Sequence, residues 1–267
     1  MIRSEADDSV GRSAVIVPIF GRHDLTRAVV ADLERENGSF DIWLVDNQGT
    51  FEPGDAGVEI VRPAVNLGWS RGCNYGVSLS WSRGYGSFIL LNNDVRLSPA
   101  FLGGLVDAAR VSGADVVAPL YDHNWPHQRG PYLGGAAAYV GRPYEYQVPF
   151  VDGTCMLIRR SVFERIGYLD ERQWPRYGWG CDKDFALRVR GAGGSVWVTE
   201  RSYLNHLARQ TASESAGYSE MEAELENDRG MLEKWGPDWR ELLYDGFENI
   251  PRLGLVQESL MKRITPP

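Results

Sequence analysis

The sequence contains few cysteines and lacks both a long hydrophobic run and a signal peptide. Its three cysteines are widely spaced among 267 residues, and no two form a Cys-x-x-Cys pair. So sparse and odd a set argues against a disulfide scaffold and favours a reducing compartment. No segment approaches the roughly 20 apolar residues of a membrane span, and residues 1–13 are polar and acidic. We therefore expect a cytoplasmic protein, with a peripheral membrane contact or a homodimer still compatible with the sequence.

An excess of basic residues is also missing. The chain carries 28 Lys and Arg against 36 Asp and Glu, which gives a formal net charge of −8 at pH 7. Stable binding to a nucleic-acid backbone needs a basic footprint and is not expected. With 43% hydrophobic and 24% charged residues, the chain is long enough for one large α/β domain with an appendage.

Short apolar runs alternate with helical patterns in the first half of the chain. This alternation predicts a mostly parallel, doubly wound sheet with helices on both faces. The predicted strands are 14–20, 40–47, 57–62, 87–94 and 114–120. The predicted helices are 24–36 with Asp24 as N-cap, 68–84, and a third that opens at Ser98-Pro99.

Residues 121–148 interrupt this alternation with a segment rich in Gly, Pro, Tyr and His that has no clear period. A loop of this length inside a compact domain is usually functional or mobile. Beyond it the pattern predicts strands at 150–160 and 194–200 and helices at 161–167, 182–193 and 217–235.

Polar side chains follow several of the predicted strands. Asp46-Asn47 ends the second strand, Asn92-Asn93-Asp94 ends the fourth, and Asp152 lies near the start of the strand at 150–160. Each alone is explained by the turn preference of Asn and Asp. In a parallel sheet, however, the ends of the second and fourth strands lie at one edge, where open α/β sheets bind nucleotides. Together these residues favour a binding site.

Several segments, in order, resemble the family 2 glycosyltransferases, which are inverting enzymes of the GT-A fold, and most closely their rhamnosyltransferase-like members. The resemblance covers roughly residues 13–210. The matching segments are VIVPIFGR (15–22), WLVDNQ (43–48), NLGWSRGCNYGV (66–77), LLNNDV (90–95), GWGCDKDFALRVR (178–190) and NHLAR (205–209). NLGWSRGCNYGV is the most specific of these matches, because it carries the family's Asn-x-Gly-(Phe/Trp)…Asn-x-Gly signature.

The resemblance implies a metal-dependent inverting transfer from a UDP- or dTDP-linked sugar to an acceptor hydroxyl. It implies Asp182 as the general base, and Asp94 and His206 as ligands of Mg²⁺ or Mn²⁺. The implied contacts to the nucleotide sugar are Asp46, which would bind the base imide, and Pro18, Phe20, Asn66, Gly68, Arg71, Asn74, Asn92 and Asn93. On the acceptor side they are Asp152, Trp179 and Cys181.

The resemblance also implies the division of the chain. Residues 1–12 would be a flexible N-terminus and 13–210 a GT-A-type catalytic domain, with a nucleotide-binding half (13–120) and an acceptor-side half (121–210). Residues 211–267 would form a C-terminal helical appendage. The acceptor stays open among a glycan, a lipid-linked intermediate, a natural product, a protein and a modified base.

This chemistry is physically consistent. A divalent cation stabilises the charge that develops on the β-phosphate of the leaving nucleoside diphosphate. Mg²⁺ keeps several waters, so one carboxylate and one imidazole suffice as protein ligands, and the imidazole shifts the preference slightly toward Mn²⁺. Inversion requires a carboxylate that deprotonates the acceptor on the face opposite the leaving group.

Three positions depart from the family pattern. Gly21 stands where the first turn usually has Asn, Asn92 replaces the first carboxylate of the metal motif, and Cys181 replaces the Glu before the base. Asn92 and Cys181 support an alternative, a degenerate module that binds nucleotide sugar or carbohydrate without turnover. A sugar nucleotidyltransferase is a weaker alternative, because no Gly-rich basic loop follows the first strand.

Other residues have two interpretations each. Asp184 is a helix-surface charge paired with Arg188 at i+4 or a catalytic group. The glycines of residues 66–77 allow either close approach of the nucleotide or tight helix–sheet packing. His123 and His127 are exposed loop residues or acceptor contacts.

Overall fold

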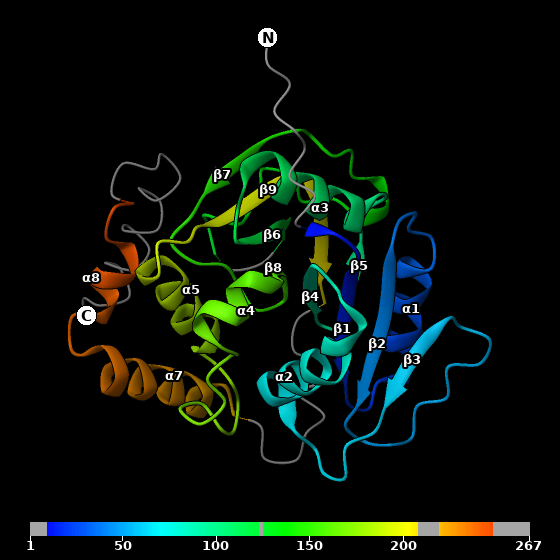
Figure 1. Cartoon of the computed structure of the whole chain (residues 1–267), viewed down its shortest axis with the longest axis horizontal. Coiled ribbons are helices and arrows are strands. Elements are labelled where there is room, and N and C mark those ends of the chain that lie inside the picture. Colours follow the sequence, from blue (N-terminus) through cyan, green and yellow to red (C-terminus); the bar gives the residue numbers. More distant parts are fainter. Residues whose placement is uncertain (1–9, 123–124, 208–218, 248–267) are drawn as a thin grey trace.

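The computed structural model describes residues 10–122, 125–207 and 219–247, which form a nine-stranded sheet flanked by helices (Figure 1). The strand order is β3-β2-β1-β4-β8-β6-β9-β5, and β7 pairs with β9. The strands are β1 (Ser13–Ile19), β2 (Phe40–Asp46), β3 (Val58–Val61), β4 (Ser87–Leu91), β5 (Val95–Leu97), β6 (Val116–Tyr121), β7 (Glu145–Gln147), β8 (Cys155–Arg159) and β9 (Val196–His206). The α-helices are α1 (His23–Leu33), α2 (Gly68–Ser80), α3 (Phe101–Ser112), α4 (Arg160–Ile166), α5 (Cys181–Gly191), α7 (Glu220–Trp235) and α8 (Trp239–Tyr244), and short 3-10 helices are η2 (Trp81–Arg83) and η3 (Ala136–Ala138).

The sheet is parallel in its first half and mixed in its second. β1 pairs in parallel with β2 and with β4, and β2 pairs in parallel with β3, as the alternating pattern predicts. β8, in contrast, runs antiparallel to β4 and β6, and both β5 and β7 run antiparallel to β9. A parallel pair needs a crossover connection, usually a helix. The described part of the β6–β8 connection contains η3 and β7 but no α-helix that could serve as a crossover. Accordingly, β8 runs antiparallel to β6.

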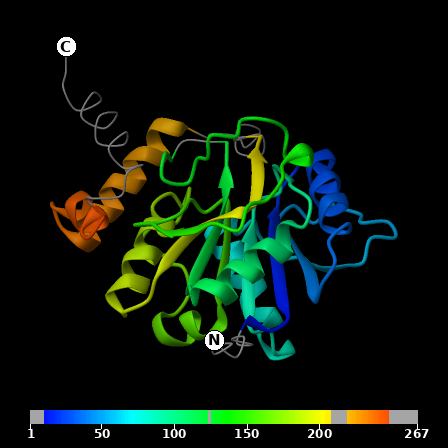
Figure 2. The same ribbon diagram turned by 90° about the horizontal axis from the view of Figure 1, so that it is seen from above.

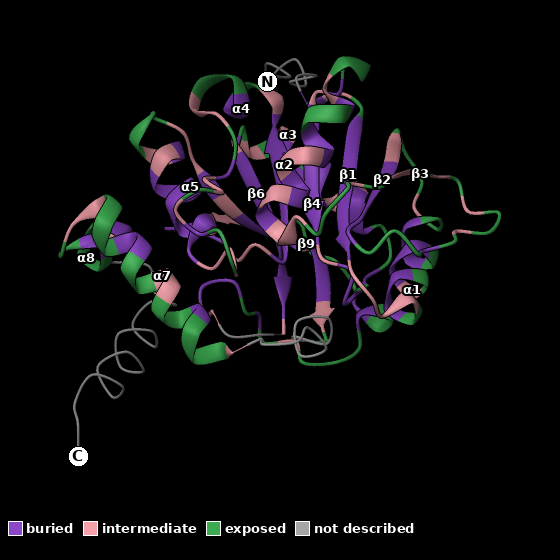
Figure 3. Cartoon of the chain, turned by 90° about the horizontal axis from the view of Figure 1, so that it is seen from below, coloured by how far each residue is buried: buried purple, intermediate pink, exposed green. Residues whose placement is uncertain are grey.

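Hydrophobic residues alternate between two cores, one on each face of the sheet. Figure 2 shows the helices that cover the sheet. In β1, Ala14 and Ile16 pack with residues of α2, α4 and α5, whereas Val15 and Val17 pack with residues of α1 and α3. This period of two is expected for strands that are covered on both faces. Figure 3 shows the strands as the buried centre of the molecule.

Two helix starts differ from the sequence prediction. The first helix begins at His23 with Arg22 as N-cap, so Asp24 lies in the first turn and binds the Arg22 guanidinium instead of capping. The third helix begins at Phe101, two residues after Pro99. The Glu36 carboxylate accepts hydrogen bonds from the Phe101 and Leu102 N–H groups at 3.0 and 2.9 Å, so it caps this helix from a distant segment.

The C-terminal helices α7 and α8 lie on the opposite side of the molecule from β3 (Figure 1). Asp184 of α5 is fully buried and accepts a hydrogen bond from Arg188 Nε at 2.8 Å, so the i+4 pair is present but internal. From α7, Trp235 Nε1 and Lys234 Nζ also reach Asp184, at 3.0 and 2.8 Å. Asp184 therefore joins α7 to the domain. None of the described helices is long and apolar enough to cross a membrane.

Two glycines of the 66–77 segment allow α2 to lie close to β1 and β2. A Cβ built at Gly76 would overlap Ile16 Cγ2 and lie 3.1 Å from Val45 Cγ2. At Gly72 it would lie 3.2 Å from Pro18 Cβ. Of the two interpretations of these glycines, the structure supports tight helix–sheet packing for Gly72 and Gly76.

We expect Gly76→Ala to destabilise the protein by about 1–3 kcal/mol, because its methyl group meets two buried side chains of the sheet. Gly103→Ala is the matched control, since a Cβ at this helical glycine meets nothing within 4 Å. Alanine there should be neutral or stabilise by up to about 1 kcal/mol. Urea unfolding of both variants measures the difference, and equal effects would contradict the packing role of Gly76.

Candidate active site

The polar ends of the parallel strands meet at one edge of the sheet. β1 lies between β2 and β4 and runs parallel to both, so Asp46 and the turn Asn92–Asp94 are at the same edge. The antiparallel β8 begins at this edge, where the Asn92 N–H donates to the Thr154 carbonyl at 2.9 Å. The segment Asp152–Thr154 therefore joins the same group of side chains.

Asp94 and His206 lie side by side because β5 pairs with β9. Val95 is the register partner of His206, and the Leu207 N–H donates to the Asp94 carbonyl at 2.9 Å. His206 Nε2 lies 3.4 Å from Asp94 Oδ1, and both side chains are largely buried. The strand pairing thus brings together the two predicted metal ligands, which are 112 residues apart in the sequence.

The charge around His206 favours its protonated form. Burial alone lowers the pKa of this imidazole, but the carboxylates of Asp94, Asp152 and Asp122 outweigh burial and raise its pKa above the usual value. A metal ion that used this imidazole as a ligand would compete with the proton, so its binding would depend on pH.

A series of contacts connects the predicted metal ligands Asp94 and His206 with Asp182. Thr154 Oγ1 lies 3.5 Å from His206 Nδ1, and the Thr154 N–H and hydroxyl both bind Asp152 Oδ1. The adjacent Gly153 N–H donates to Asp182 Oδ2 at 3.3 Å. The predicted base and the predicted metal ligands are thus parts of one site.

Asp182 lies in the first turn of α5 with its side chain 14% exposed. Its Oδ1 accepts a hydrogen bond from the Lys183 N–H at 2.8 Å. Burial raises the pKa of Asp182 above its usual value, and the Asp152 carboxylate adds to this increase. The Lys183 ammonium and the two backbone N–H groups offset part of the effect. A raised pKa makes a carboxylate a stronger base for a proton from an acceptor hydroxyl.

Two polar atoms near this site are buried and have no hydrogen-bond partner among the described residues. They are Asn92 Oδ1 and Trp69 Nε1. The six-membered ring of Trp69 lies against Gly153, where a Cβ would be 2.9 Å from Cη2. Because buried polar atoms are nearly always paired in folded proteins, these two atoms are available to a bound water or to a polar ligand.

Asp46 lies at the predicted edge of the sheet, but its carboxylate already binds other groups of the protein. It is 1% exposed and accepts hydrogen bonds from the N–H groups of Gln48, Gly49 and Phe51. Arg62 Nε lies 3.5 Å from the same carboxylate. These three hydrogen bonds and the ion pair occupy most of the roughly four acceptor sites of the carboxylate, which leaves little room for a base imide. Asp46 holds the turn after β2.

Asn74 and Asn93 were predicted to contact the nucleotide sugar, yet both connect elements of the fold. The Asn74 amide donates to the Leu169 carbonyl and to Glu171, and it accepts from the Leu169 N–H at 3.1 Å. Asn93 is 4% exposed and donates to Thr26 Oγ1 at 3.1 Å. In this geometry both amides support the site from outside it.

Pro18 and Cys181 are also buried. Pro18 lies beneath Gly72 of α2, and Cys181 is 1% exposed. Burial raises the pKa of the Cys181 thiol well above its usual value, so the side chain is a neutral core residue. The acceptor contact predicted for Cys181 needs correction, because its side chain packs inside the domain.

The remaining predicted contacts are more open. The exposed Asn66 accepts a hydrogen bond from the Gly68 N–H at 2.8 Å, and Gly68 has a φ of 70° that favours glycine. Arg71 Nε donates to the Leu67 carbonyl at 3.2 Å. The side chains of Phe20, Arg71 and Trp179 are half-buried.

Sequence reasoning missed Thr154, Asp122 and Gln128. Asp122 accepts the His206 N–H at 2.9 Å and the Asn205 amide at 2.8 Å, and Gln128 Oε1 accepts the Asp152 N–H at 2.9 Å. Asp122 directly follows β6. It could have been predicted in the same way as Asp46 and Asp94, which were selected because they follow predicted strands. Thr154 and Gln128 have no comparable signal, because only the folded loop brings them to the site.

The segment after β6 is anchored to the sheet. Asn205 Oδ1 accepts the Ala136 N–H at 2.6 Å, and Tyr203 Oη donates to the Gly134 carbonyl at 3.2 Å. His127 is fully buried, with Nε2 2.9 Å from the Phe150 carbonyl oxygen, so it is neither an exposed loop residue nor a direct acceptor contact. His123 lies outside the described residues.

The sequence profile of glycosyl transferase family 2 matches residues 14–167, which include both Asp46 and Asp94. The chain belongs to this family. It is 38% identical over 203 residues to an uncharacterised protein of Mycobacterium tuberculosis, which covers 76% of this chain and 77% of the relative.

Two relatives with descriptive names share less of their length with this family 2 glycosyltransferase. An N-acetylglucosaminyl-diphospho-decaprenol L-rhamnosyltransferase of Mycobacterium tuberculosis is 31% identical over 49% of this chain and 50% of its own. An O-antigen biosynthesis protein of Myxococcus xanthus is 28% identical over 72% of this chain, but over 17% of its own.

A solved structure supports the fold. The crystal structure of GalNAc-T7 with UDP, GalNAc and Mn²⁺ superposes with a TM-score of 0.64 at 16% identity. The likeness covers 96% of this chain and 55% of GalNAc-T7, so this chain spans about half the length of that protein. The GT-A fold expected from the sequence is confirmed.

His127 should make the folding stability depend on pH. Burial lowers the pKa of its ring from 6.5 to about 4. As the pH falls below 6.5, the unfolded chain therefore takes up a proton at this ring that the folded protein does not, and stability falls. Between pH 7 and pH 5 we expect the wild type to lose about 2 kcal/mol more unfolding free energy than His127→Gln. Urea unfolding at both pH values measures this, and identical losses would contradict it.

Proposed function

We propose that this glycosyltransferase moves a sugar from a nucleoside diphosphate sugar to an acceptor hydroxyl with inversion at the anomeric carbon. Asp182 is the general base that accepts the hydroxyl proton as the new C–O bond forms and the bond to the diphosphate breaks. The observation that carries the proposal is the contact chain from Asp94 and His206 through Thr154 and Gly153 to Asp182. It joins a place for the diphosphate with a buried base.

The residues around Asp94 fit a divalent cation. They provide one carboxylate oxygen and one imidazole nitrogen, which suit Mg²⁺ or Mn²⁺ when substrate phosphate and water complete the coordination. The described residues contain no group of three or more His, Cys, Asp or Glu that could hold a metal alone. Substrate must therefore supply ligands. The bound cation would stabilise the charge on the leaving diphosphate.

The family and the position of the proposed site at the carboxyl edge of the sheet support a nucleotide-linked sugar as the donor. We propose a UDP- or dTDP-linked sugar, in line with the UDP present in the GalNAc-T7 structure and with the rhamnosyltransferase among the relatives. Asn92 in place of a carboxylate leaves one charge fewer beside the diphosphate. The nucleotide would lie over the turns that Asp46 and Asn66 shape, between the ends of β1 and β2 and the start of α2.

The acceptor would approach from the side of Asp152, Trp69 and Trp179. Rings beside the base can stack on the apolar C–H faces of a sugar, and Trp69 lies against the backbone that donates to Asp182. A saccharide acceptor, free or carried on a lipid diphosphate as in the named rhamnosyltransferase, fits this surface.

A second candidate is a non-catalytic nucleotide-sugar module, which the neutral Asn92 favours. Release of nucleoside diphosphate from a donor distinguishes the two. A thermal-shift screen of UDP- and dTDP-sugars with Mn²⁺ would first identify the donor, because a ligand that binds the folded state raises its stability. Slow release that depends on the metal and on Asp182 then supports the enzyme, and binding without release supports the module.

We expect Asp182→Asn to reduce kcat by at least about a hundredfold, because general-base catalysis typically contributes 10²–10⁴-fold. Donor affinity should stay within about twofold, because Asp182 lies on the acceptor side. Titration calorimetry and a nucleoside diphosphate release assay measure the two quantities. Near-normal turnover would remove Asp182 as the base.

We expect donor affinity to depend on the cation through Asp94. In Mn²⁺, Asp94→Asn should weaken donor binding about tenfold or more, whereas in excess EDTA the wild type and the variant should bind equally weakly. Asp107→Asn on the exposed face of α3 is the matched control and should behave as the wild type. Equal wild-type affinity with Mn²⁺ and with EDTA would refute the metal assignment.

A further inference from the structure

Lys183 is a buried cation beside the proposed base. It follows Asp182 in α5, is 9% exposed, and its Nζ lies 3.9 Å from Asp182 Oδ1. Lysine is rarely this buried unless its charge is paired, because desolvation of an ammonium group is costly. The presence of the Lys183 ammonium beside the largely buried Asp182 carboxylate therefore points to a specific role.

The position of the Lys183 ammonium is determined by contacts from two sides. Nζ donates a hydrogen bond to Asn227 Oδ1 of α7 at 3.1 Å. It also lies 5.2 Å from the ring centroid of Trp125 and 5.7 Å from that of Phe150, within the range of cation–π attraction. The ammonium therefore has few positions available other than the one beside Asp182.

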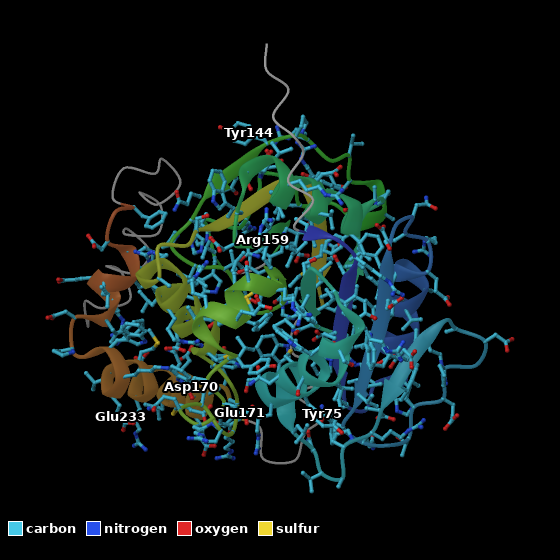
Figure 4. The ribbon with its side chains drawn as sticks, in the orientation of Figure 1. Tyr75, Tyr144, Arg159, Asp170, Glu171 and Glu233 are labelled. Atoms are coloured by element: carbon cyan, nitrogen blue, oxygen red, sulfur yellow. The ribbon has the colours of Figure 1, made fainter. Side chains whose placement is uncertain are left out.

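Helix α7 holds the whole segment that leads to the base. The Glu226 carboxylate accepts the N–H groups of Arg176 and Tyr177 at 2.9 and 2.8 Å. Gly230 lies directly against the buried ring of Trp174, where a Cβ would be 3.0 Å from Cζ2. Where α7 meets this segment, near the labels of Asp170 and Glu233 in Figure 4, Lys234 Nζ donates to Asp170 at 2.6 Å and Gln173 Nε2 donates to Glu233 at 2.8 Å.

We propose that Lys183, fixed by Asn227 of α7, is a positioning residue that keeps the Asp182 carboxylate ionised and oriented toward the acceptor. The C-terminal helix α7 is then part of the catalytic unit. This inference rests on the function proposed above for Asp182. It assigns a catalytic purpose to the contacts between α7 and the segment at 170–184.

The charges that face Asp182 from the neighbouring elements support this role. The Asp152 carboxylate, from the segment before β8, opposes ionisation of Asp182, and the Lys183 ammonium promotes it. Burial raises the pKa of the nearby Cys181 thiol and of the Tyr121 phenol on β6, so both are neutral. Burial lowers the pKa of His127, and Asp184 is paired with Arg188 and Lys234. Lys183 therefore counteracts the increase in the pKa of Asp182 that Asp152 causes.

The central experiment is the pH profile of kcat/KM for Lys183→Met, which keeps the length of the side chain and removes its charge. Removal of the cation should move the acidic limb to higher pH by about one unit, because an opposite charge at this distance shifts a carboxyl group by one unit or more. The variant should therefore lose about tenfold in rate on the acidic limb and little at high pH. Donor affinity in Mn²⁺ should be unchanged.

Three further variants test whether the charge of Lys183 and its contact with α7 set the pH profile. Lys183→Arg should restore most of the acidic limb, because it returns the charge. Asn227→Ala should shift the limb in the same direction by a smaller amount, and it serves as the test if Lys183→Met fails to fold. Glu224→Ala, at an exposed position of the same helix, should keep the wild-type profile.

The outcomes separate this inference from the function on which it rests. Near-normal turnover by Asp182→Asn would overturn the proposed base, whatever Lys183 does. If Asp182→Asn is inactive while Lys183→Met or Asn227→Ala keeps the wild-type pH profile, or loses activity equally at every pH, the positioning role is overturned and the base stands. A shifted limb that Lys183→Arg restores supports the inference.

Discussion

The antiparallel pairing of β5 with β9 is the interaction on which the site depends. It places Asp94 and His206 within 3.4 Å of one another, although they come from opposite halves of the chain. The reversed entry of β8 then brings the segment Asp152–Thr154 to the same edge, where it contacts both His206 and Asp182. A fully parallel sheet would have placed the start of β8 at the other edge.

Several residues of the family motifs support the site without lining it. Asp46 organises the turn after β2, Asn74 fixes α2 to the segment at 169–171, and Gly76 brings α2 against β1 and β2. Such roles are physically demanding, because a buried polar group or a close helix–sheet contact tolerates few substitutions. In this chain the motif segments therefore include residues that support the fold around the proposed site.

The region around Asp182 combines opposing electrostatic effects. Burial and Asp152 favour the neutral acid, whereas Lys183 and two backbone N–H groups favour the carboxylate. The balance depends on positions set by other elements, since Lys183 is held by α7 and by two aromatic rings. Elements distant in sequence from the motifs thereby influence the charge of the proposed base.

The family, the parallel half of the sheet and the sheet edge that carries the proposed site could be predicted from the sequence, because alternating apolar runs and ordered motifs are local signals. The same motifs identified Asp94, Asp182 and His206 as candidate residues. The folded structure was needed to show that Asn74, Asn93 and Cys181 face inward and that Thr154, Asp122 and Lys183 lie beside those candidates. The reason is that strand direction, burial and long-range contacts depend on which elements pack together, and no local pattern encodes them.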